Sequence, residues 1–280
     1  FQGESNGLPS KDEAADYLES YARHFSLPIQ YRTKVTSMVQ DEKRFVLRTD
    51  QGDFSARHVV VATGPFHKPR IPEFAKRLPD RVIQLHSAEY RNPGQLQQGS
   101  VLIVGAGNSG AQIAVELAMQ RSVYLSYGRP LRFKPLYLFG TSIFWYFDKL
   151  GLLEADADSA LGGWLRKQPE QIYGLELKKL LNAKAIGSCP KCADADETGI
   201  RFEDGTSFHA DNVVWATGFR ADYGWIRIPG AFREDGTPVT RNGVSPVAGL
   251  FFLGLPWQSS RGSALMGWVA KDAERLAQML

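Results

Sequence analysis

The sequence has few cysteines, no long apolar run and no strong charge of one sign. Cys189 and Cys192 are the two cysteines among 280 residues, too few for a disulfide framework. No signal-peptide pattern occurs at Phe1. Together these features favour a reducing, cytoplasmic setting.

The apolar and charged residues exclude two further classes of partner. The longest apolar stretch, residues 135–153, is interrupted by glycine, polar and charged residues. It therefore lacks the span of about 20 apolar residues that a membrane helix needs, and we expect no membrane contact. A formal net charge of +3, with 33 basic and 30 acidic residues interspersed, predicts no nucleic-acid partner.

Three short apolar runs read as buried strands, and two of them end in the same tripeptide. Residues 59–64 and 213–218 both finish in Ala-Thr-Gly, and the run 101–104 lies between them. Because the two similar strands enclose the third, we expect one domain to be inserted into another. The predicted class is α/β, with two nested Rossmann-like domains.

The run 101–104 is followed by Gly105-Ala106-Gly107-Asn108-Ser109-Gly110. In a Gly-x-Gly-x-x-Gly turn the first glycine permits the tight turn, the second admits a pyrophosphate, and the third lets helix pack on strand. The start of the helix then offers free N–H groups to the phosphates. An apolar strand before the motif, an amphipathic helix after it and a second strand at 123–126 supply the right context. The sequence therefore predicts a dinucleotide site.

The end of the second strand indicates NADP rather than NAD. An NAD site places an acidic residue there to bind the ribose 2′-hydroxyl, whereas residues 123–129 contain none. Ser126 and Arg129 stand at that place, and Arg132 and Lys134 follow. A hydroxyl and several cations suit a 2′-phosphate.

The flanking regions predict further elements. Ser10 and Glu13 form a capping box for a helix over 11–25. Residues 45–61 read as a hairpin that turns at 50–53, and residues 250–254 read as a strand before a helix from about Ser263 to the end.

At this point the chain resembles the bacterial flavin-containing monooxygenases, a group that includes plant YUCCA-type enzymes and is related to Baeyer–Villiger monooxygenases. The resemblance covers nearly the whole chain. The residues that carry it are Pro9-Ser10, 17–22, Phe25, 60–64, Pro69, His86-Ser87, Tyr90-Arg91, 215–219, 254–257 and 262–265.

The resemblance implies that FAD binds the outer domain and NADPH the inner one, and that the flavin activates O2 as a C4a-hydroperoxide. A nitrogen or sulfur centre of a small-molecule substrate then accepts one oxygen atom. Because the cofactor supplies this chemistry, no catalytic triad is expected, and no catalytic residue is named.

The resemblance also implies which residues hold the cofactors. The NADPH pyrophosphate would meet Gly105, Gly107, Asn108, Ser109 and Gly110, and its 2′-phosphate Ser126 and Arg129. The flavin side would comprise Ala62, Thr63, Gly64, Gly254, Gly262, Ser263 and Ala264. Thr217 and Gly218 are also expected to bind a cofactor.

Two departures from the family pattern are visible. The family has Phe-x-Gly shortly before its histidine, whereas this chain has Asp80 and Val82; the role of His86 is then equally the domain linker or the cofactor. The family's first glycine motif, for FAD, is also missing, and Phe1 begins about where that segment ends. We therefore expect a chain that lacks the front of the FAD domain, with outer segments 1–70 and 219–280 around an inner domain 71–218.

Two alternatives stay open. Cys189-Pro190-Lys191-Cys192 is a CxxC, which is typical of NADPH-dependent flavoprotein disulfide reductases, although an incidental loop pair explains it as well. A truncated, non-catalytic NADP-binding remnant is the other. Substrate and oligomeric state are not encoded in any recognisable pattern.

Overall fold

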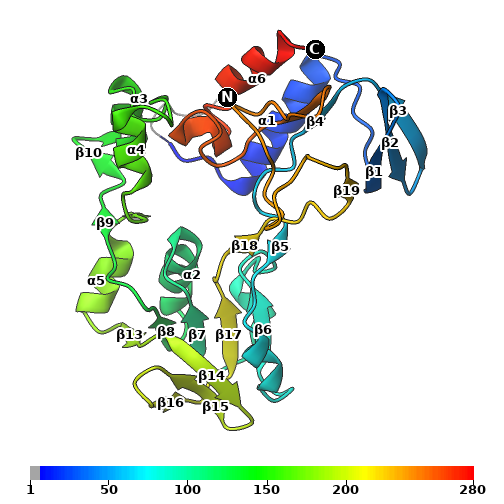
Figure 1. Cartoon of the computed structure of the whole chain (residues 1–280). Helices are drawn as coiled ribbons and strands as arrows, with labels where there is room; N and C mark the ends of the chain where they lie inside the picture. Colours follow the sequence, from blue (N-terminus) through cyan, green and yellow to red (C-terminus); the bar gives the residue numbers. More distant parts are fainter. Residues whose placement is uncertain (1–6) are drawn as a thin grey trace.

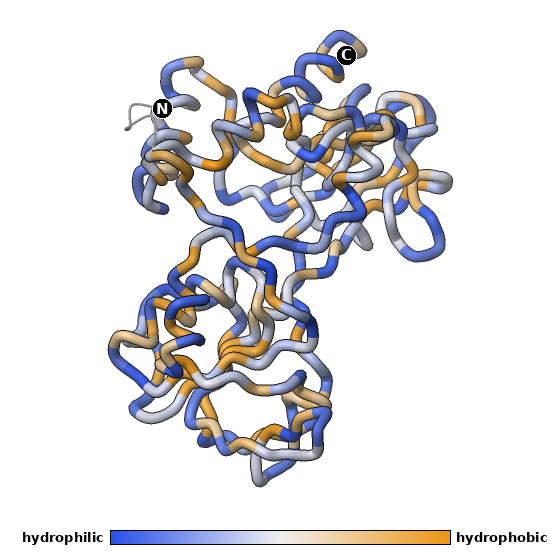
Figure 2. Tube along the Cα trace, turned by 90° about the vertical axis from the view of Figure 1, so that its left-hand side faces the viewer, coloured by the Kyte–Doolittle hydropathy of each residue, from blue (hydrophilic) through white to orange (hydrophobic). Residues whose placement is uncertain are grey.

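The computed structural model describes residues 7–280, and Phe1, where the outer domain is expected to begin, lies outside them. The chain forms two lobes joined by a narrow waist, with the first described residues and the C-terminus in one lobe (Figures 1 and 2). The other lobe holds the strands from β6 (Ile83–His86) to β17 (Asn212–Trp215). One lobe is therefore inserted into the other, and the nested α/β fold predicted from the two Ala-Thr-Gly segments is confirmed.

A five-stranded parallel sheet forms the centre of the inner lobe. Its strands follow the order β13-β8-β7-β17-β6, with β7 at Val101–Val104, β8 at Val123–Ser126 and β13 at Ile186–Cys189. Every residue of β7 and β17 is buried, as expected for central strands of a parallel sheet covered on both faces. The strand register places the last residues of the five strands in one row: Cys189, Ser126, Val104, Trp215 and His86.

Different elements cover the two faces of this sheet. Helices α2 (Asn108–Ala118) and α5 (Glu176–Asn182) pack against Ile103 and Val214 on one face. The other face, with Leu102 and Trp215, meets a small antiparallel sheet and the helical turn η1 (Glu73–Arg77). The antiparallel sheet consists of β14 (Cys192–Asp196), β15 (Gly199–Phe202) and β16 (Ser207–Phe208).

The outer lobe contains two smaller sheets. Strands β4 (Val59–Val61) and β20 (Leu250–Phe252) pair in parallel. The second sheet has the order β19-β1-β2-β3, with β1 at Val35–Asp41, β2 at Arg44–Thr49, β3 at Gly52–Ala56 and β19 at Ile226–Arg227. Met38, Phe45 and Phe252 belong to the core between them.

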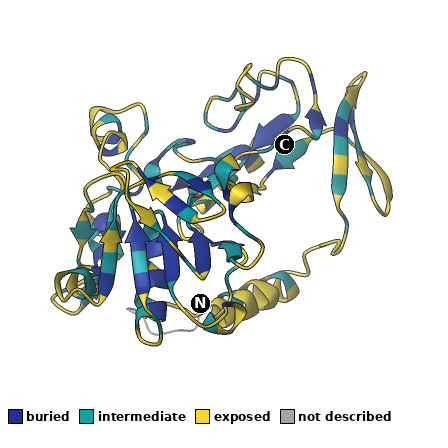
Figure 3. Ribbon diagram, turned by 90° about the horizontal axis from the view of Figure 1, so that it is seen from below, coloured by how far each residue is buried: buried dark blue, intermediate teal, exposed yellow. Residues whose placement is uncertain are grey.

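The expected return strand over 54–61 is wrong in one respect. It divides into β3 and β4, which belong to different sheets, because Val59 leaves the hairpin to pair with Leu250. Strand β1 was not predicted at all. Helix α1 (Lys11–His24) confirms its prediction, including the capping box of Ser10 and Glu13, but none of its residues is buried (Figure 3).

The waist consists of two chain crossings. Strand β5 (Lys68–Pro69) pairs with β18 (Phe219–Arg220) in antiparallel fashion. The backbone N–H of Arg70 also donates to the carbonyl of Gly218 at 2.9 Å. The two lobes are thus connected by strands of two residues each.

A helical insertion, residues 136–171, leaves the inner lobe and reaches toward the outer one (Figure 1). It starts after β9 (Phe133–Lys134) and ends before β12 (Ile172–Tyr173), and these two strands pair in parallel. Its elements are β10 (Tyr137–Leu138), β11 (Thr141–Ser142), α3 (Ile143–Lys149) and α4 (Ala160–Arg166).

The expected helix from Ser263 to the end is two shorter elements. They are the helical turn η3 (Arg261–Ala264) and helix α6 (Ala270–Ala277). The backbone N–H of Gly262 donates to the carbonyl of Leu153 in the insertion at 2.7 Å, so a tertiary contact fixes η3 separately. A further turn, η2, spans Pro93–Gln95.

Candidate functional site: the glycine turn and the two strand ends

The turn between β7 and α2 needs its glycines. Gly105 has φ +103°, and a Cβ atom there would collide with the carbonyl oxygen of Ala216. A Cβ at Gly110 would collide with the carbonyl oxygen of Gly105 and come within 3.1 Å of the Ala216 side chain. The first glycine therefore permits the turn and the third lets α2 approach β17, as the motif predicts.

The start of α2 is open to an anion. Gly107 is its N-cap residue and provides no side chain to cap the first turn, where backbone N–H groups lack helical partners. Ser109 is exposed. The partial positive charge of the helix start and these N–H groups suit a pyrophosphate.

The Asn108 side chain has a structural use at this turn. Its amide donates to the carbonyl of Gln171 and its oxygen accepts from the N–H of Tyr173, both at 3.0 Å. Asn108 thus holds β12 beside the start of α2, so its contribution to a pyrophosphate site is its backbone N–H.

At the end of β8, Ser126 is not exposed as a 2′-phosphate ligand would be. Ser126 is 1% exposed, and its hydroxyl donates to the carbonyl of Pro190 at 2.6 Å and accepts from the N–H of Cys192 at 3.2 Å. A hydroxyl enclosed in this way does not fit a 2′-phosphate, so the burial argues against that part of the assignment. Arg129 is exposed and keeps its guanidinium available.

A second cation lies beside the same segment. The Lys191 side chain packs so closely on Gly128 that a Cβ there would lie 2.6 Å from its Cδ. Its ammonium pairs with Glu203 at the surface. The sequence could not reveal Lys191, because 63 positions separate it from Gly128 and strand pairing between β8 and β13 brings them together.

The Cys189–Cys192 pair lies at two strand ends and not in the expected loop. Cys189 ends β13 and Cys192 begins β14, with two residues between them. Both thiols are free, and the Cys192 sulfur lies 3.2 Å from the Ser126 hydroxyl. Burial also raises the pKa of the Cys192 thiol to about 11, which disfavours the reactive thiolate.

Both Ala-Thr-Gly segments turn the chain at a strand end. Gly64 has φ +68° and Gly218 φ +79°, in the left-handed region that glycine adopts without strain. The Thr217 hydroxyl donates to the carbonyl of Arg70, and Thr63 lies 3.0 Å from Nε2 of His67. Both hydroxyls are thus used at the waist.

His86 contacts the linker. Its ring is fully buried, and Nε2 donates to the carbonyl of Gly218 at 3.0 Å while Nδ1 accepts from the N–H of Ala88. The ring also lies edge-on to Phe219. Of the two roles considered from the sequence, the structure therefore shows the linker role. Burial lowers the pKa of His86 below its usual value.

The expected flavin side has unfilled space at the ends of β4 and β20. Because Val61 pairs with Phe252, the glycines that follow, Gly64 and Gly254, lie at neighbouring strand ends. A Cβ at either position would meet nothing within 4 Å, so both leave room for a ring system to approach backbone. Ala62 directly follows β4 and is exposed.

The other residues expected on the flavin side are partly committed to packing. Gly262 donates its N–H to Leu153. Ser263 is fully buried, and its hydroxyl accepts from the N–H groups of Ser259 and Ser260 at 3.1 Å each. Ala264 is half-buried. The Gly262 bond docks the helical insertion, whereas the Ser263 bonds hold its own segment. Gly254 is therefore the more open glycine of the two.

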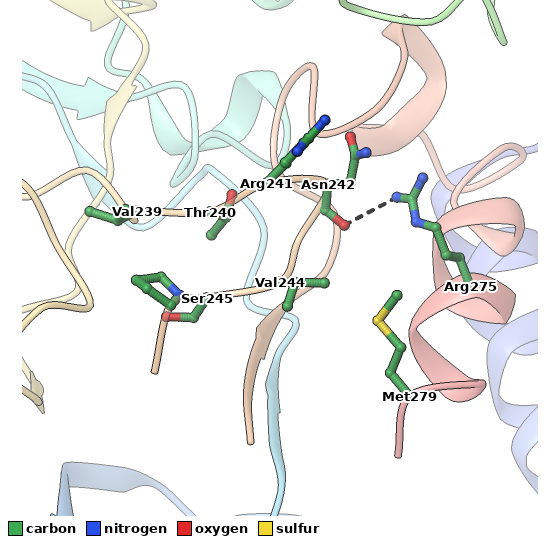
Figure 4. Close-up of a pocket in the computed structure, with 9 residues that line it drawn as sticks. Val239, Thr240, Arg241, Asn242, Val244, Ser245, Arg275 and Met279 are labelled. Atoms are coloured by element: carbon green, nitrogen blue, oxygen red, sulfur yellow. Dashed lines mark hydrogen bonds between the residues drawn. The ribbon is translucent and has the colours of Figure 1, made fainter. Parts of the chain in front are cut away.

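Two cavities lie outside the glycine turn. One of about 550 Å³ lies in the outer lobe between residues 239–246 and α6, where Arg275 donates to the carbonyl of Asn242 (Figure 4). The other, of about 450 Å³, is lined by Tyr127, Pro130 and Lys178 among others. The second cavity borders the segment that carries Arg129.

Within residues 7–280 no helix is long and apolar enough to cross a membrane. Across the same part of the chain, no three His, Cys, Asp or Glu side chains gather as a metal site would require.

Comparison with known proteins agrees with this architecture. The family model described as pyridine nucleotide-disulphide oxidoreductase matches residues 3–134. An uncharacterized CzcO-like oxidoreductase of Geobacillus kaustophilus is 52% identical over 99% of this chain and 79% of its own length. The probable indole-3-pyruvate monooxygenase YUCCA1 of Arabidopsis thaliana is 27% identical over 96% of this chain and 72% of its length. The flavin-containing monooxygenase from Stenotrophomonas maltophilia superposes with a TM-score of 0.75 at 23% identity, over 99% of this chain and 79% of that one.

The chain belongs to the family of the CzcO-like oxidoreductases, and it is similar to the flavin-containing monooxygenases. It is a flavin-dependent oxidoreductase, and its cofactors are FAD and NADP. The resemblance stated from the sequence is thereby confirmed.

Proposed function

We propose that this monooxygenase uses NADPH, in preference to NADH, to deliver one oxygen atom of O2 to a nitrogen or sulfur centre of a small molecule. A cytoplasmic location, with neither nucleic acid nor membrane as partner, belongs to the same proposal. The observation that carries it is the open start of α2, near the exposed cations Arg129 and Lys191. The outer lobe adds open space at Gly64 and Gly254, where a flavin would bind.

The inner lobe supports the NADPH half of the proposal. Gly107 and the first N–H groups of α2 would receive the pyrophosphate. Glu170 stands beside this place, 3.3 Å from where a Cβ of Gly107 would lie, so its exposed carboxylate has to turn aside. Arg129 and Lys191 would hold the 2′-phosphate, and the neighbouring cavity would take the adenosine.

The outer lobe supports the flavin half. Gly64 and Gly254 would let the flavin approach the backbone at the ends of β4 and β20. When bound, the flavin accepts a hydride from the nicotinamide and activates O2. The protein's task is to hold the two cofactors together and to exclude water.

The decisive measurement is the visible spectrum of the purified protein under air, before and after NADPH. We expect a flavin band that bleaches and returns, with NADPH consumed faster than NADH. In Arg129→Ala and Lys191→Ala, we expect the kcat/KM ratio of NADPH to NADH to fall about 10-fold each. Lys43→Ala, an exposed change in the outer hairpin, is the control. An unchanged ratio in both variants would remove the 2′-phosphate assignment.

The disulfide reductase alternative has its own test. It requires Cys192 as a redox thiol and predicts complete loss of turnover in Cys192→Ser. We expect NADPH oxidation and oxygenation in that variant to stay within about 2-fold of the wild type, because the sulfur is buried in the core and its hydrogen bond goes to the Ser126 hydroxyl. Loss of all turnover with an intact flavin spectrum would favour the reductase.

A further inference from the structure

Tyr173 is placed between the glycine motif and the outer lobe. It ends β12, where its backbone N–H donates to Oδ1 of Asn108, the first residue of α2. Its hydroxyl accepts from Nη2 of Arg261 at 2.8 Å. Since Arg261 begins η3 in the outer lobe, the Tyr173 side chain is one of the contacts that bridge the two lobes.

The two ends of this bridge are fixed in different ways. On the inner side, Asn108 bonds both Gln171 and Tyr173, so β12 cannot shift without moving the start of α2. On the outer side, the Arg261 guanidinium lies 5.5 Å from the centre of the Phe147 ring. Arg261 makes no ion pair with any carboxylate of residues 7–280. Its guanidinium donates a hydrogen bond to the Tyr173 hydroxyl instead.

The helical insertion holds Arg261 in place. Gly262 donates to Leu153 and Ala157 donates to Ser259, both at 2.7 Å. The Trp268 indole donates to Asp148 at 2.7 Å. Figure 1 shows the insertion meeting the C-terminal segment, well away from the waist. The lobes are thus joined at two places, and the Tyr173 bridge belongs to the second.

The waist is a short connection between the lobes. It consists of two strands of two residues each and of hydrogen bonds such as that from Thr217 to Arg70. Hydride transfer depends on the alignment of two rings, and a misplacement of 1 Å costs up to about 100-fold in rate. A second contact away from the waist is therefore the natural place to fix that alignment.

We propose that Tyr173 is a positioning residue that couples occupation of the glycine motif to the orientation of the outer lobe, through Asn108 on one side and Arg261 on the other. This inference rests on the proposed NADPH-dependent function. NADP+ bound at the start of α2 orders Asn108, Asn108 orders β12, and the Tyr173 hydroxyl transmits that order to η3.

The test is hydrogen exchange of the flavin-loaded protein with and without NADP+. In the wild type we expect NADP+ to slow exchange in residues 108–111 and also in residues 259–264. In Tyr173→Phe we expect protection of 108–111 to stay, and that of 259–264 to fall at least about 3-fold. Arg261→Gln breaks the same bond from the other side and should behave alike.

Kinetics give a second readout. In Tyr173→Phe the rate of flavin reduction by NADPH should fall about 10-fold, while the KM for NADPH stays within about 2-fold. The matched control is Tyr146→Phe, since the Tyr146 hydroxyl donates its hydrogen bond to Leu138 within the helical insertion. Both of its readouts should match the wild type.

The outcomes separate the two proposals. If NADP+ protects 108–111 in the wild type and the protection of 259–264 survives in both bridge variants, the coupling is overturned and the proposed function stands. If NADP+ leaves 108–111 unprotected in the wild type, the proposed function fails, and the coupling fails with it.

Discussion

Two crossings of the same sequence, Ala-Thr-Gly, occur in different surroundings. Ala216-Thr217-Gly218 follows β17, a strand flanked by β7 and β6 in a five-stranded sheet. Ala62-Thr63-Gly64 follows β4, which among residues 7–280 pairs with β20 alone. Both glycines take a positive φ, so the tripeptide encodes the turn, whereas its neighbours decide what the turn supports.

The side chains at the two crossings show this difference. Thr217 donates its hydroxyl across the waist to Arg70, and the carbonyl of Gly218 accepts from both His86 and Arg70. At the other crossing Thr63 bonds His67 of its own segment. Two of these bonds join the inner crossing to Arg70, and the third joins it to His86 of β6. At the outer crossing Gly64 faces open space.

The largest expected effect comes from a substitution at Gly110, which lets α2 pack closely on Gly105 and Ala216 at the inner crossing. In Gly110→Val a Cβ would collide with the carbonyl oxygen of Gly105, and backbone cannot yield as a flexible side chain can. We expect a loss of more than about 3 kcal/mol in the free energy of unfolding, together with loss of NADP+ binding by calorimetry. Gly163→Ala in α4, where a Cβ meets nothing within 4 Å, should fold normally. A stable Gly110→Val protein with wild-type affinity would contradict the packing described.

The outer strand end should respond more weakly to the same kind of change. Gly254→Ala meets no atom within 4 Å and has only its φ of +81° to pay in strain, about 1 kcal/mol of unfolding free energy. Its effect should appear mainly as weaker flavin retention, measured by the absorbance of flavin after gel filtration. A flavin content equal to the wild type would place the ring away from Gly254.

His86 provides the next test, through pH. Its folded pKa lies below the ordinary value because burial disfavours the charged ring, although Gly218 and Glu89 oppose this shift. The unfolded chain therefore takes up the proton more readily, and stability is lost as pH falls through the unfolded pKa of about 6.5. The melting temperature should drop between about pH 7 and pH 5 more steeply in the wild type than in His86→Gln.

His86→Gln keeps a donor for Gly218 but cannot titrate, so it separates charge from hydrogen bonding. His86→Leu removes both and should cost about 1–3 kcal/mol at every pH. Equal slopes for the wild type and His86→Gln would show that other groups cause the acid sensitivity.

Strands β7 and β8 of the inner lobe were predictable from the sequence, whereas the tertiary contacts at their ends were not. Strands β7 and β8 were expected at 101–104 and 123–126, their observed bounds, because apolar runs and the glycine turn are local signals. The enclosure of Ser126 depends on Pro190 and Cys192, more than 60 positions away. Likewise, no local signal shows that Gly262 bonds Leu153.

The smallest expected effect compares the two threonines directly. At the waist, Asp222 donates its N–H to Nδ1 of His67 at 2.7 Å, so Nε2 carries the proton and donates it to Thr63. Thr63→Val removes this bond within one segment, whereas Thr217→Val removes a bond that joins the two crossings. Each should cost about 1 kcal/mol in unfolding free energy, the net contribution of one hydrogen bond.

Their functional effects should nevertheless differ, because of these two bonds only that of Thr217 joins the two crossings directly. We expect Thr217→Val to slow flavin reduction by about 3-fold through a looser waist, while Thr63→Val leaves that rate unchanged. Stopped-flow reduction at saturating NADPH measures both. If Thr63→Val were instead the slower variant, its hydroxyl would be acting on the flavin, and the outer crossing rather than the inner one would carry the chemistry.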